Sequence, residues 1–284
     1  MTTDARPQDK QVTANGLRLH YLDWGGDAPA PALAFHGFAL NCHSWDEVAP
    51  RLRDRLRLLA FDQRGHGLSD RAQEVSDYSR DAMVGDIAQI VTTLRLERPV
   101  IIGHSMGGIN SLTFAARYPD QVRALVLVDV GPQIAAAGAQ EVQRFVSGPY
   151  ELESLDAWVE HTHKYYPHRP KERIRERLAV SLSPTPHGTL AKQYDERFRD
   201  NFIRNIEATE EQRWESARAL RCPTLLIRGG DSPVLTAEGA EKFAREVAVV
   251  RLVTIPGAAH SVAGDKPEEF AAAVRAFLDE VSVK

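Results

Sequence analysis

Residues 100–110, VIIGHSMGGIN, place a serine between two glycines directly after a run of β-branched residues. The apolar run predicts a buried strand, and the apolar spacing over 105–117 predicts a helix. Glycines on both sides of Ser105 allow strand and helix to approach closely and allow the serine a strained backbone. Its hydroxyl would then face the edge of a sheet, beside a helix N-terminus that favours negative charge. The stretch therefore predicts a nucleophilic serine at a strand-to-helix turn.

The chain around this turn alternates strand-like and helix-like segments. Short β-rich runs occur at 17–22, 32–35, 57–61, 100–103, 125–130, 225–228 and 251–255. Helical periodicity occurs at 82–94, 105–117, 237–246 and 267–281. Such alternation predicts an α/β fold, with a mostly parallel, twisted sheet covered by helices on both faces. Ligands bind beyond the carboxyl ends of the strands in these sheets, so catalytic residues are expected directly after strands.

The alternation stops between residues 132 and 220. This stretch holds helical patterns, turn signals and many aromatic residues, but no convincing strand. We expect a helical cap over 132–220, packed on the carboxyl edge of a core formed by 1–131 and 221–284. The charged run KERIRERL, residues 171–178, is predicted to be a solvated helix face.

Composition excludes several classes of function. The 284 residues carry a net charge of −4, which does not favour binding to nucleic acid. The first residues lack the apolar core of a signal peptide, and no apolar run approaches the ~18 residues of a membrane span, so a cytoplasmic protein without a membrane partner is expected. Cys42 and Cys222 lack metal-ligand spacing, which predicts reduced thiols and no metal or other cofactor.

A serine nucleophile needs a base, because its hydroxyl is almost never ionised near neutral pH. His260 follows the last predicted strand after a Gly-Ala-Ala turn and precedes the final predicted helix. In a parallel sheet this position lies on the same edge as Ser105. His260 is therefore the predicted general base.

Several motifs, in order, resemble the α/β-hydrolase superfamily over nearly the whole chain. They are FHGF (35–38), FDQRGHGLSD (61–70), GHSMGG (103–108), LVLVDVGP (125–132), PTLLIRGGDSP (223–233) and GAAHSV (257–262). The resemblance implies an α/β-hydrolase fold and an oxyanion hole built from the backbone N–H groups of Phe38 and Met106. It also implies that Asp62, Arg64 and His66 support the loop beneath the site.

The acid of the triad departs from the commonest pattern of that superfamily. The resemblance places an aspartate about three residues beyond Gly229, where this chain has Ser232, and Asp231 stands one residue early. Asp129, at the end of an earlier strand, occupies an alternative acid position. We favour Asp129, with Asp231 as the alternative, because a triad acid must be buried and fixed by a strand end.

These features predict a serine hydrolase that cleaves a small carboxylic ester or related acyl compound. The same triad would serve a hydrolase of carbon–carbon bonds or a lactonase, and a ligand receptor without activity could share the fold. The residues expected to line the substrate pocket are His36, Gly37, Leu40, Trp45 and His104. The sequence leaves open whether the protein forms a homo-oligomer.

Overall fold

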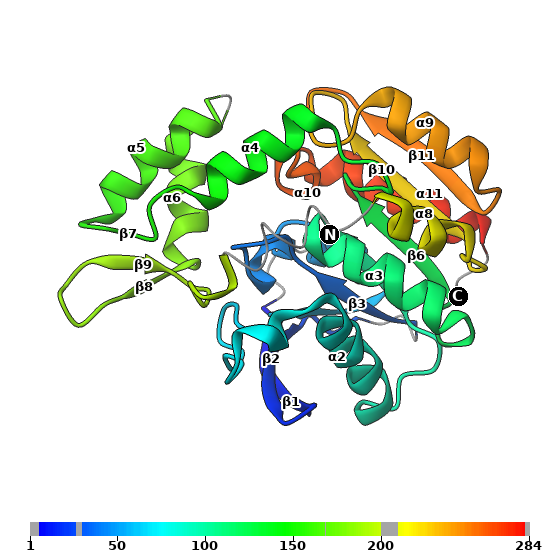
Figure 1. The fold of residues 1–284 in the computed structure, drawn as a ribbon, viewed down its shortest axis with the longest axis horizontal. Coiled ribbons are helices and arrows are strands. Elements are labelled where there is room, and N and C mark those ends of the chain that lie inside the picture. Colours follow the sequence, from blue (N-terminus) through cyan, green and yellow to red (C-terminus); the bar gives the residue numbers. More distant parts are fainter. Residues whose placement is uncertain (1–5, 27–29, 168, 200–209, 282–284) are drawn as a thin grey trace.

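The computed structural model describes residues 6–26, 30–167, 169–199 and 210–281. An eight-stranded sheet with the order β1-β2-β4-β3-β5-β6-β10-β11 forms its centre (Figure 1). The six strands from β4 to β11 run parallel, while β1 and β2 pair antiparallel at one edge. The strands are β1 (Gln8–Ala14), β2 (Leu17–Asp23), β3 (Pro31–Phe35), β4 (Arg57–Phe61), β5 (Val100–His104), β6 (Ala124–Val128), β10 (Thr224–Gly229) and β11 (Val250–Ile255).

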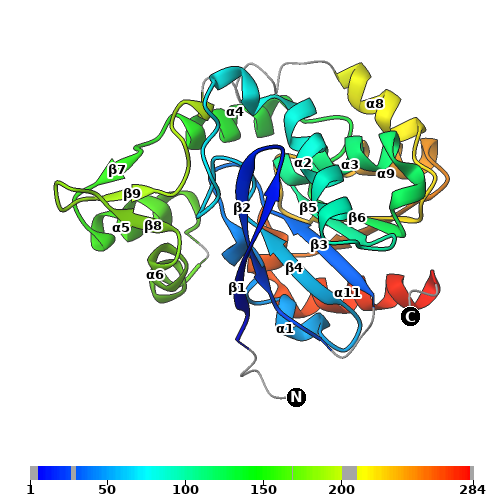
Figure 2. The same ribbon diagram turned by 90° about the horizontal axis from the view of Figure 1, so that it is seen from below.

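Helices cover both faces of this sheet, as Figure 2 shows for α2, α3 and α9 on one side and α1 and α11 on the other. The first face carries α2 (Arg80–Thr93), α3 (Met106–Arg117), α8 (Glu210–Arg218) and α9 (Ala237–Glu246). The second face carries α1 (Ala49–Leu52) and α11 (Pro267–Glu280). Short helical turns occupy Cys42–Trp45, Val75–Tyr78, Pro119–Gln121 and α10 (Val262–Asp265). The predicted α/β class, with a mostly parallel sheet between two helical layers, is confirmed.

All seven strands expected from the sequence are present, within two residues at each end. Strand β6 ends at Val128, earlier than expected, so Asp129 lies in the turn that follows. The sequence did not indicate β1, because its segment QDKQVTA is polar and its pairing with β2 is a matter of tertiary structure.

The segment after β6 crosses over one end of the sheet, on the left of Figure 1. It contains α4 (Ala136–Val146), α5 (Leu155–Tyr165) and α6 (Lys171–Ala179). It also contains a three-stranded sheet of β7 (Glu151–Leu152), β9 (Leu190–Lys192) and β8 (Leu182–Pro184), where the sequence predicted no strand. Strands of two or three residues are too short to produce a visible alternation of apolar residues.

The end of the predicted cap belongs to the core. Helix α8 lies inside the range 132–220, yet Trp214 packs edge-on against Phe243 of α9, with ring centroids 6.1 Å apart. Trp214 is 3% exposed and is part of the apolar layer beneath α2 and α3. The part of the insertion that stands away from the sheet therefore ends before α8. Residues 168 and 200–209 of the predicted cap lie outside the described residues.

Within the described ranges, the helices are either too short or too polar to span a lipid bilayer.

Candidate active site

Ser105 occupies the turn between β5 and α3, in a conformation that few non-glycine residues adopt. Its φ and ψ are 51° and −116°. The flanking glycines are required by space, because a Cβ at Gly103 would lie 2.5 Å from the carbonyl oxygen of Gly107. A Cβ at Gly107 would lie 2.4 Å from the carbonyl oxygen of Phe35. The pattern of small residues around Ser105 thus reflects a close crossing of strand and helix.

Asp129 and His260 form a hydrogen-bonded pair beside this turn. Nδ1 of His260 lies 2.7 Å from Oδ2 of Asp129, and the Asp129 side chain is fully buried. The backbone N–H of Gly229 donates to Oδ1 of Asp129 at 2.9 Å, and the hydroxyl of Ser232 donates to Oδ2. Asp129 itself has a φ of 50°, in the left-handed region. Two donors thus fix the carboxylate, and its Oδ2 contacts one nitrogen of the imidazole.

The structure separates the two candidate acids. Asp231 is exposed, and its backbone N–H donates to the carbonyl oxygen of Ala258 at 2.9 Å. Ser232, which stands in the usual acid slot, instead donates a hydrogen bond to Asp129. Among the two carboxylates considered, Asp129 is the one that contacts His260.

Ser105 and His260 line the same small cavity, of about 70 Å³, together with Gly37 and Phe38. No direct hydrogen bond joins the Ser105 hydroxyl to His260 in the part of the chain that the structure describes. Such contacts are often long before substrate binds and tighten in the reactive complex. The cavity therefore presents a serine and a carboxylate-bound histidine to one small space.

The two expected oxyanion donors belong to segments that meet at the nucleophile turn. Phe38 lines the small cavity, and Met106 is the first residue of α3. The next N–H of that helix, from Gly107, donates to the carbonyl oxygen of His36 at 3.1 Å. This bond ties the start of α3 to the segment that carries Phe38.

Three of the five expected pocket residues, Gly37, Leu40 and His104, line the small cavity. His36 instead lies beneath it, fully buried, with its nitrogens 2.7 Å from the Gly37 carbonyl oxygen and 3.1 Å from the Gln63 nitrogen. Trp45 is buried in the apolar core, packs on Phe270 at 6.4 Å between ring centroids, and lines another cavity, of about 10 Å³, together with Leu40 and His104. The sequence could not separate His36 and Trp45 from the residues that line the small cavity, because the direction of a side chain in a loop depends on tertiary contacts.

His104 connects the nucleophile turn to the loop that carries the base. Nε2 of His104 lies 2.9 Å from the carbonyl oxygen of His260, and the two rings are 4.7 Å apart. Burial, with the nearby His260 ring, holds the pKa of His104 well below its usual value. A neutral His104 can donate this hydrogen bond without placing a second positive charge beside the base.

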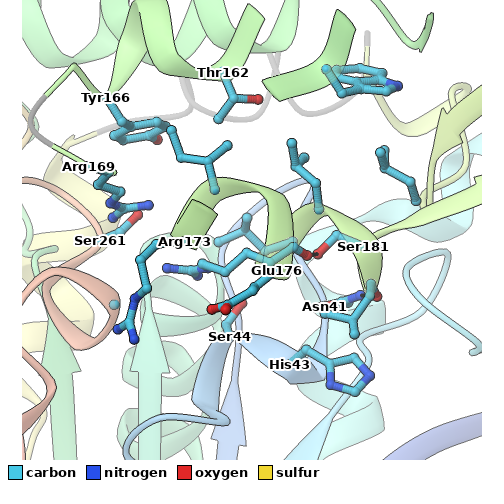
Figure 3. Close-up of a pocket in the computed structure, with 18 of the residues that line it drawn as sticks. Asn41, His43, Ser44, Thr162, Tyr166, Arg169, Arg173, Glu176, Ser181 and Ser261 are labelled. Carbon is cyan, nitrogen blue, oxygen red and sulfur yellow. Dashed lines mark hydrogen bonds between the residues drawn. The ribbon is translucent and has the colours of Figure 1, made fainter. Parts of the chain in front are cut away.

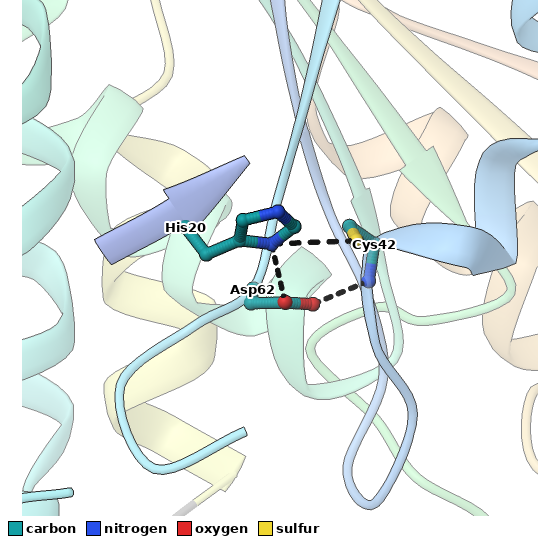
Figure 4. A group of neighbouring side chains, drawn as sticks. All are labelled: His20, Cys42 and Asp62. Carbon is teal, nitrogen blue, oxygen red and sulfur yellow. Dashed lines mark hydrogen bonds and ion pairs between the residues drawn. The ribbon is translucent and has the colours of Figure 1, made fainter. Parts of the chain in front are cut away.

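A buried cluster beneath the site joins His20, Cys42 and Asp62 (Figure 4). The backbone N–H of Cys42 donates to Asp62 at 2.6 Å, and Nδ1 of His20 lies 2.8 Å from the same carboxylate. Leu68 also donates its N–H to Asp62, at 3.0 Å. A metal ion would have to displace these contacts. The geometry agrees with the predicted role of Asp62 in supporting the loop.

Arg64 and His66 of the same motif are also buried and bonded. Arg64 forms a bidentate ion pair with Asp86 of α2, with both N–O distances at 2.6 Å. Nδ1 of His66 lies 3.1 Å from the carbonyl oxygen of Arg64, and Nε2 accepts from the Ala39 N–H at 3.3 Å. Arg64 therefore ties this loop to α2, and His66 contacts the segment that carries Phe38.

A larger cavity, of about 310 Å³, adjoins the small one between the insertion and the core. Figure 3 shows Thr162, Tyr166 and Arg169 on one side of it and Asn41 and His43 on the other. The two cavities share five lining residues: Leu40, Phe145, Tyr165, Tyr166 and Ser261. The sequence did not indicate the charged residues of this cavity, such as Arg177 and Lys192, because a charged helix or strand residue is ordinarily solvated.

Comparisons with known proteins agree with this arrangement. A family model described as the alpha/beta hydrolase fold matches residues 33–267. The 2-(acetamidomethylene)succinate hydrolase of Mesorhizobium japonicum is 31% identical over 259 residues, which covers 87% of each chain. An esterase of Mycobacterium tuberculosis is 30% identical over 280 residues, covering 96% of this chain and 90% of the esterase.

The structural comparison gives the same result. The crystal structure of an alpha/beta hydrolase from Novosphingobium aromaticivorans superposes with a TM-score of 0.87 at 29% identity, covering 97% of this chain and 99% of the other. The structure of E-2-(acetamidomethylene)succinate hydrolase also gives 0.87, at 30% identity, with 96% and 99% covered. The chain belongs to the alpha/beta hydrolase family.

Proposed function

We propose that the protein is a serine hydrolase that cleaves a small carboxylic ester or a related acyl compound through an acyl-enzyme. The observation that carries the proposal is the 2.7 Å contact between Asp129 and His260 beside a strained Ser105 in one cavity. The names of the relatives, a hydrolase and an esterase, support the same class of chemistry.

The mechanism assigns one role to each residue of the triad. The Ser105 hydroxyl attacks the carbonyl carbon while Nε2 of His260 accepts its proton. Asp129 holds Nδ1–H, so that Nε2 is free to act as the base, and stabilises the imidazolium that forms. His260 then returns the proton to the leaving group. Water, deprotonated by the same histidine, releases the acyl group from Ser105.

The negative charge of the tetrahedral intermediate would be bound by the N–H groups of Phe38 and Met106. Each preorganised donor at this position typically lowers the activation barrier by about 3–4 kcal/mol. Met106 opens α3, so the positive end of the helix dipole adds to the same effect.

The insertion from α4 to β9 would serve as the cap of the substrate site. Val142 and Phe145 of α4 and Tyr165 of α5 line the cavity that contains Ser105. Apolar walls of this kind exclude water and favour the acyl portion of a substrate.

The proposal is tested by labelling and turnover together. A fluorophosphonate should add to Ser105, as located by peptide mass spectrometry, and block hydrolysis of p-nitrophenyl esters of increasing chain length. Ser105→Ala should remain unlabelled and lose at least about 10³-fold in kcat while keeping its melting temperature. Turnover by Ser105→Ala at the wild-type rate would refute the assignment, and a protein that binds esters without labelling or turnover would be a receptor.

A further inference from the structure

Arg177 is a partly buried arginine that lines the larger cavity. The residue lies near the end of α6, and its Nη1 atom is buried without a hydrogen-bond partner among the described residues. Gly264 makes room for it, because a Cβ at that position would lie 2.0 Å from Nη1. A buried cation without a partner is costly, so this position is expected to be compensated by a ligand.

The carboxylates nearest to Arg177, on Glu47 and Asp265, are already engaged by other arginines. Arg169 contacts Asp265 at 2.7 Å, and Nδ1 of His43 lies 2.8 Å from Asp46. Arg173 forms an ion pair with Glu47, which also lines the cavity. The remaining carboxylate of the lining, on Glu176, belongs to an exposed residue.

A second cation lines the same cavity without a carboxylate beside it. The Lys192 ammonium lies 4.5 Å from the ring centroid of Phe145 and 5.5 Å from that of Trp158, and it forms no ion pair within the described part of the chain. Burial, together with nearby Arg199, lowers the pKa of Lys192 to about 8. Near neutral pH both Lys192 and Arg177 therefore carry positive charge in this space.

Arg177 is also close to the reaction centre. It lines a third, small cavity together with His104, Leu40 and Ser261. His104 directly precedes Ser105 and contacts the backbone of His260. The larger cavity that Arg177 lines also shares five lining residues with the cavity that contains Ser105, so one substrate could contact both residues.

We propose that Arg177 binds a carboxylate of the substrate, so that the protein prefers acyl compounds that carry a second, anionic end. This inference rests on the proposed hydrolase function and adds the substrate class. A guanidinium offers two parallel N–H donors that match a carboxylate, and charge-assisted hydrogen bonds of this kind are strong. Lys192 would add positive potential from the cap side of the cavity.

The test compares esters that differ only in charge. The p-nitrophenyl monoesters of glutaric and adipic acid carry a carboxylate where p-nitrophenyl pentanoate and hexanoate carry a methyl group. After subtraction of spontaneous hydrolysis, wild-type kcat/KM should favour the anionic esters. Arg177→Met should lower the ratio of anionic to neutral kcat/KM by about 10- to 100-fold, which corresponds to about 1.4–2.8 kcal/mol.

Two further variants separate this role from a general effect on the helix. Gly264→Ala keeps the charge of Arg177 but displaces its guanidinium, so the same ratio should fall in part. Arg175→Met, on the exposed side of α6, removes an arginine that pairs with Asp156 and should leave the ratio unchanged. Equal ratios in wild type and Arg177→Met, or equal losses in Arg177→Met and Arg175→Met, would overturn the proposal.

Binding without turnover distinguishes this inference from the proposed function. In Ser105→Ala, calorimetry with glutarate should detect binding that Arg177→Met abolishes. Glutarate binding with no ester hydrolysis by the wild type would refute the hydrolase and keep the carboxylate site. Ester hydrolysis without glutarate binding, or tighter binding of inorganic phosphate than of glutarate, would refute the carboxylate site.

Discussion

Replacing Asp129 with asparagine is expected to abolish most activity by changing the tautomer of His260. The Gly229 N–H donates to Oδ1 of Asp129, so the asparagine oxygen is held on that side. Its NH₂ group must then face Nδ1 of His260, where the carboxylate oxygen now accepts a hydrogen bond. Nδ1 would have to accept instead of donate. The proton of the neutral ring moves to Nε2, which can no longer take the proton of Ser105.

The size of the loss in kcat depends on how strongly the site fixes the tautomer of His260. Asp129 is fully buried, so water cannot replace the lost acceptor. The same change in well-studied triads lowers kcat by ~10⁴-fold, equivalent to about 5.4 kcal/mol of transition-state stabilisation. We expect Asp129→Asn to show a loss of this order with little change in KM.

The assay is kcat on any hydrolysed p-nitrophenyl ester, with Asp231→Asn as the matched control. Asp231 is exposed, and its side chain forms no hydrogen bond with His260 in the described structure. The kcat of Asp231→Asn should therefore stay within about threefold of the wild-type value. A larger loss in Asp231→Asn than in Asp129→Asn would refute the assignment of the acid.

Two further predictions concern stability. Burial, with the neighbouring His36, lowers the pKa of His66 to about 3. Between about pH 3 and the unfolded pKa of ~6.5, the unfolded chain binds a proton at His66 that the folded chain does not. Stability therefore falls as the pH decreases through this range. Between pH 7 and pH 5, the free energy of unfolding measured with urea should therefore decrease less in His66→Gln than in the wild type, by up to about 2 kcal/mol. Parallel pH curves for the two proteins would contradict this. Gly107→Ala should cost about 3 kcal/mol or more because its Cβ meets backbone, whereas Gly85→Ala, in open helix α2, should gain about 0.5–1 kcal/mol. Melting temperatures test both, and a Gly107→Ala protein as stable as the wild type would refute the packing argument.

The elements that the sequence predicted well are those whose signal is local. Strands β5, β6 and β10 are buried on both faces, so they appear as continuous apolar runs. Ser105 and His260 follow strand ends, and parallel strands bring those ends together. Strand β1 and the three short strands of the insertion lack such a local signal.

The parts that could not be predicted depend on contacts between distant segments. The choice between Asp129 and Asp231 is decided by which side chain is buried, and both follow strand ends that meet at one edge. Arg177 belongs to a run that predicts a solvated helix, and α6 is indeed largely exposed. What distinguishes Arg177 from the other arginines of this run is that its buried Nη1 packs against Gly264, a contact between distant segments.

The contact between Ser232 and Asp129 has a consequence for how such a site can evolve. Strands β6 and β10 are neighbours, and residue 232 touches the same carboxylate oxygen that binds His260, so an acid at either position can serve the same imidazole. Ser232→Asp alone would put two carboxylates in one buried space, where one of them must be protonated. Loss of Asp129 alone would leave His260 without its acceptor. Each single substitution is expected to lower activity, so a lineage whose triad acid follows β6 is expected to keep it there.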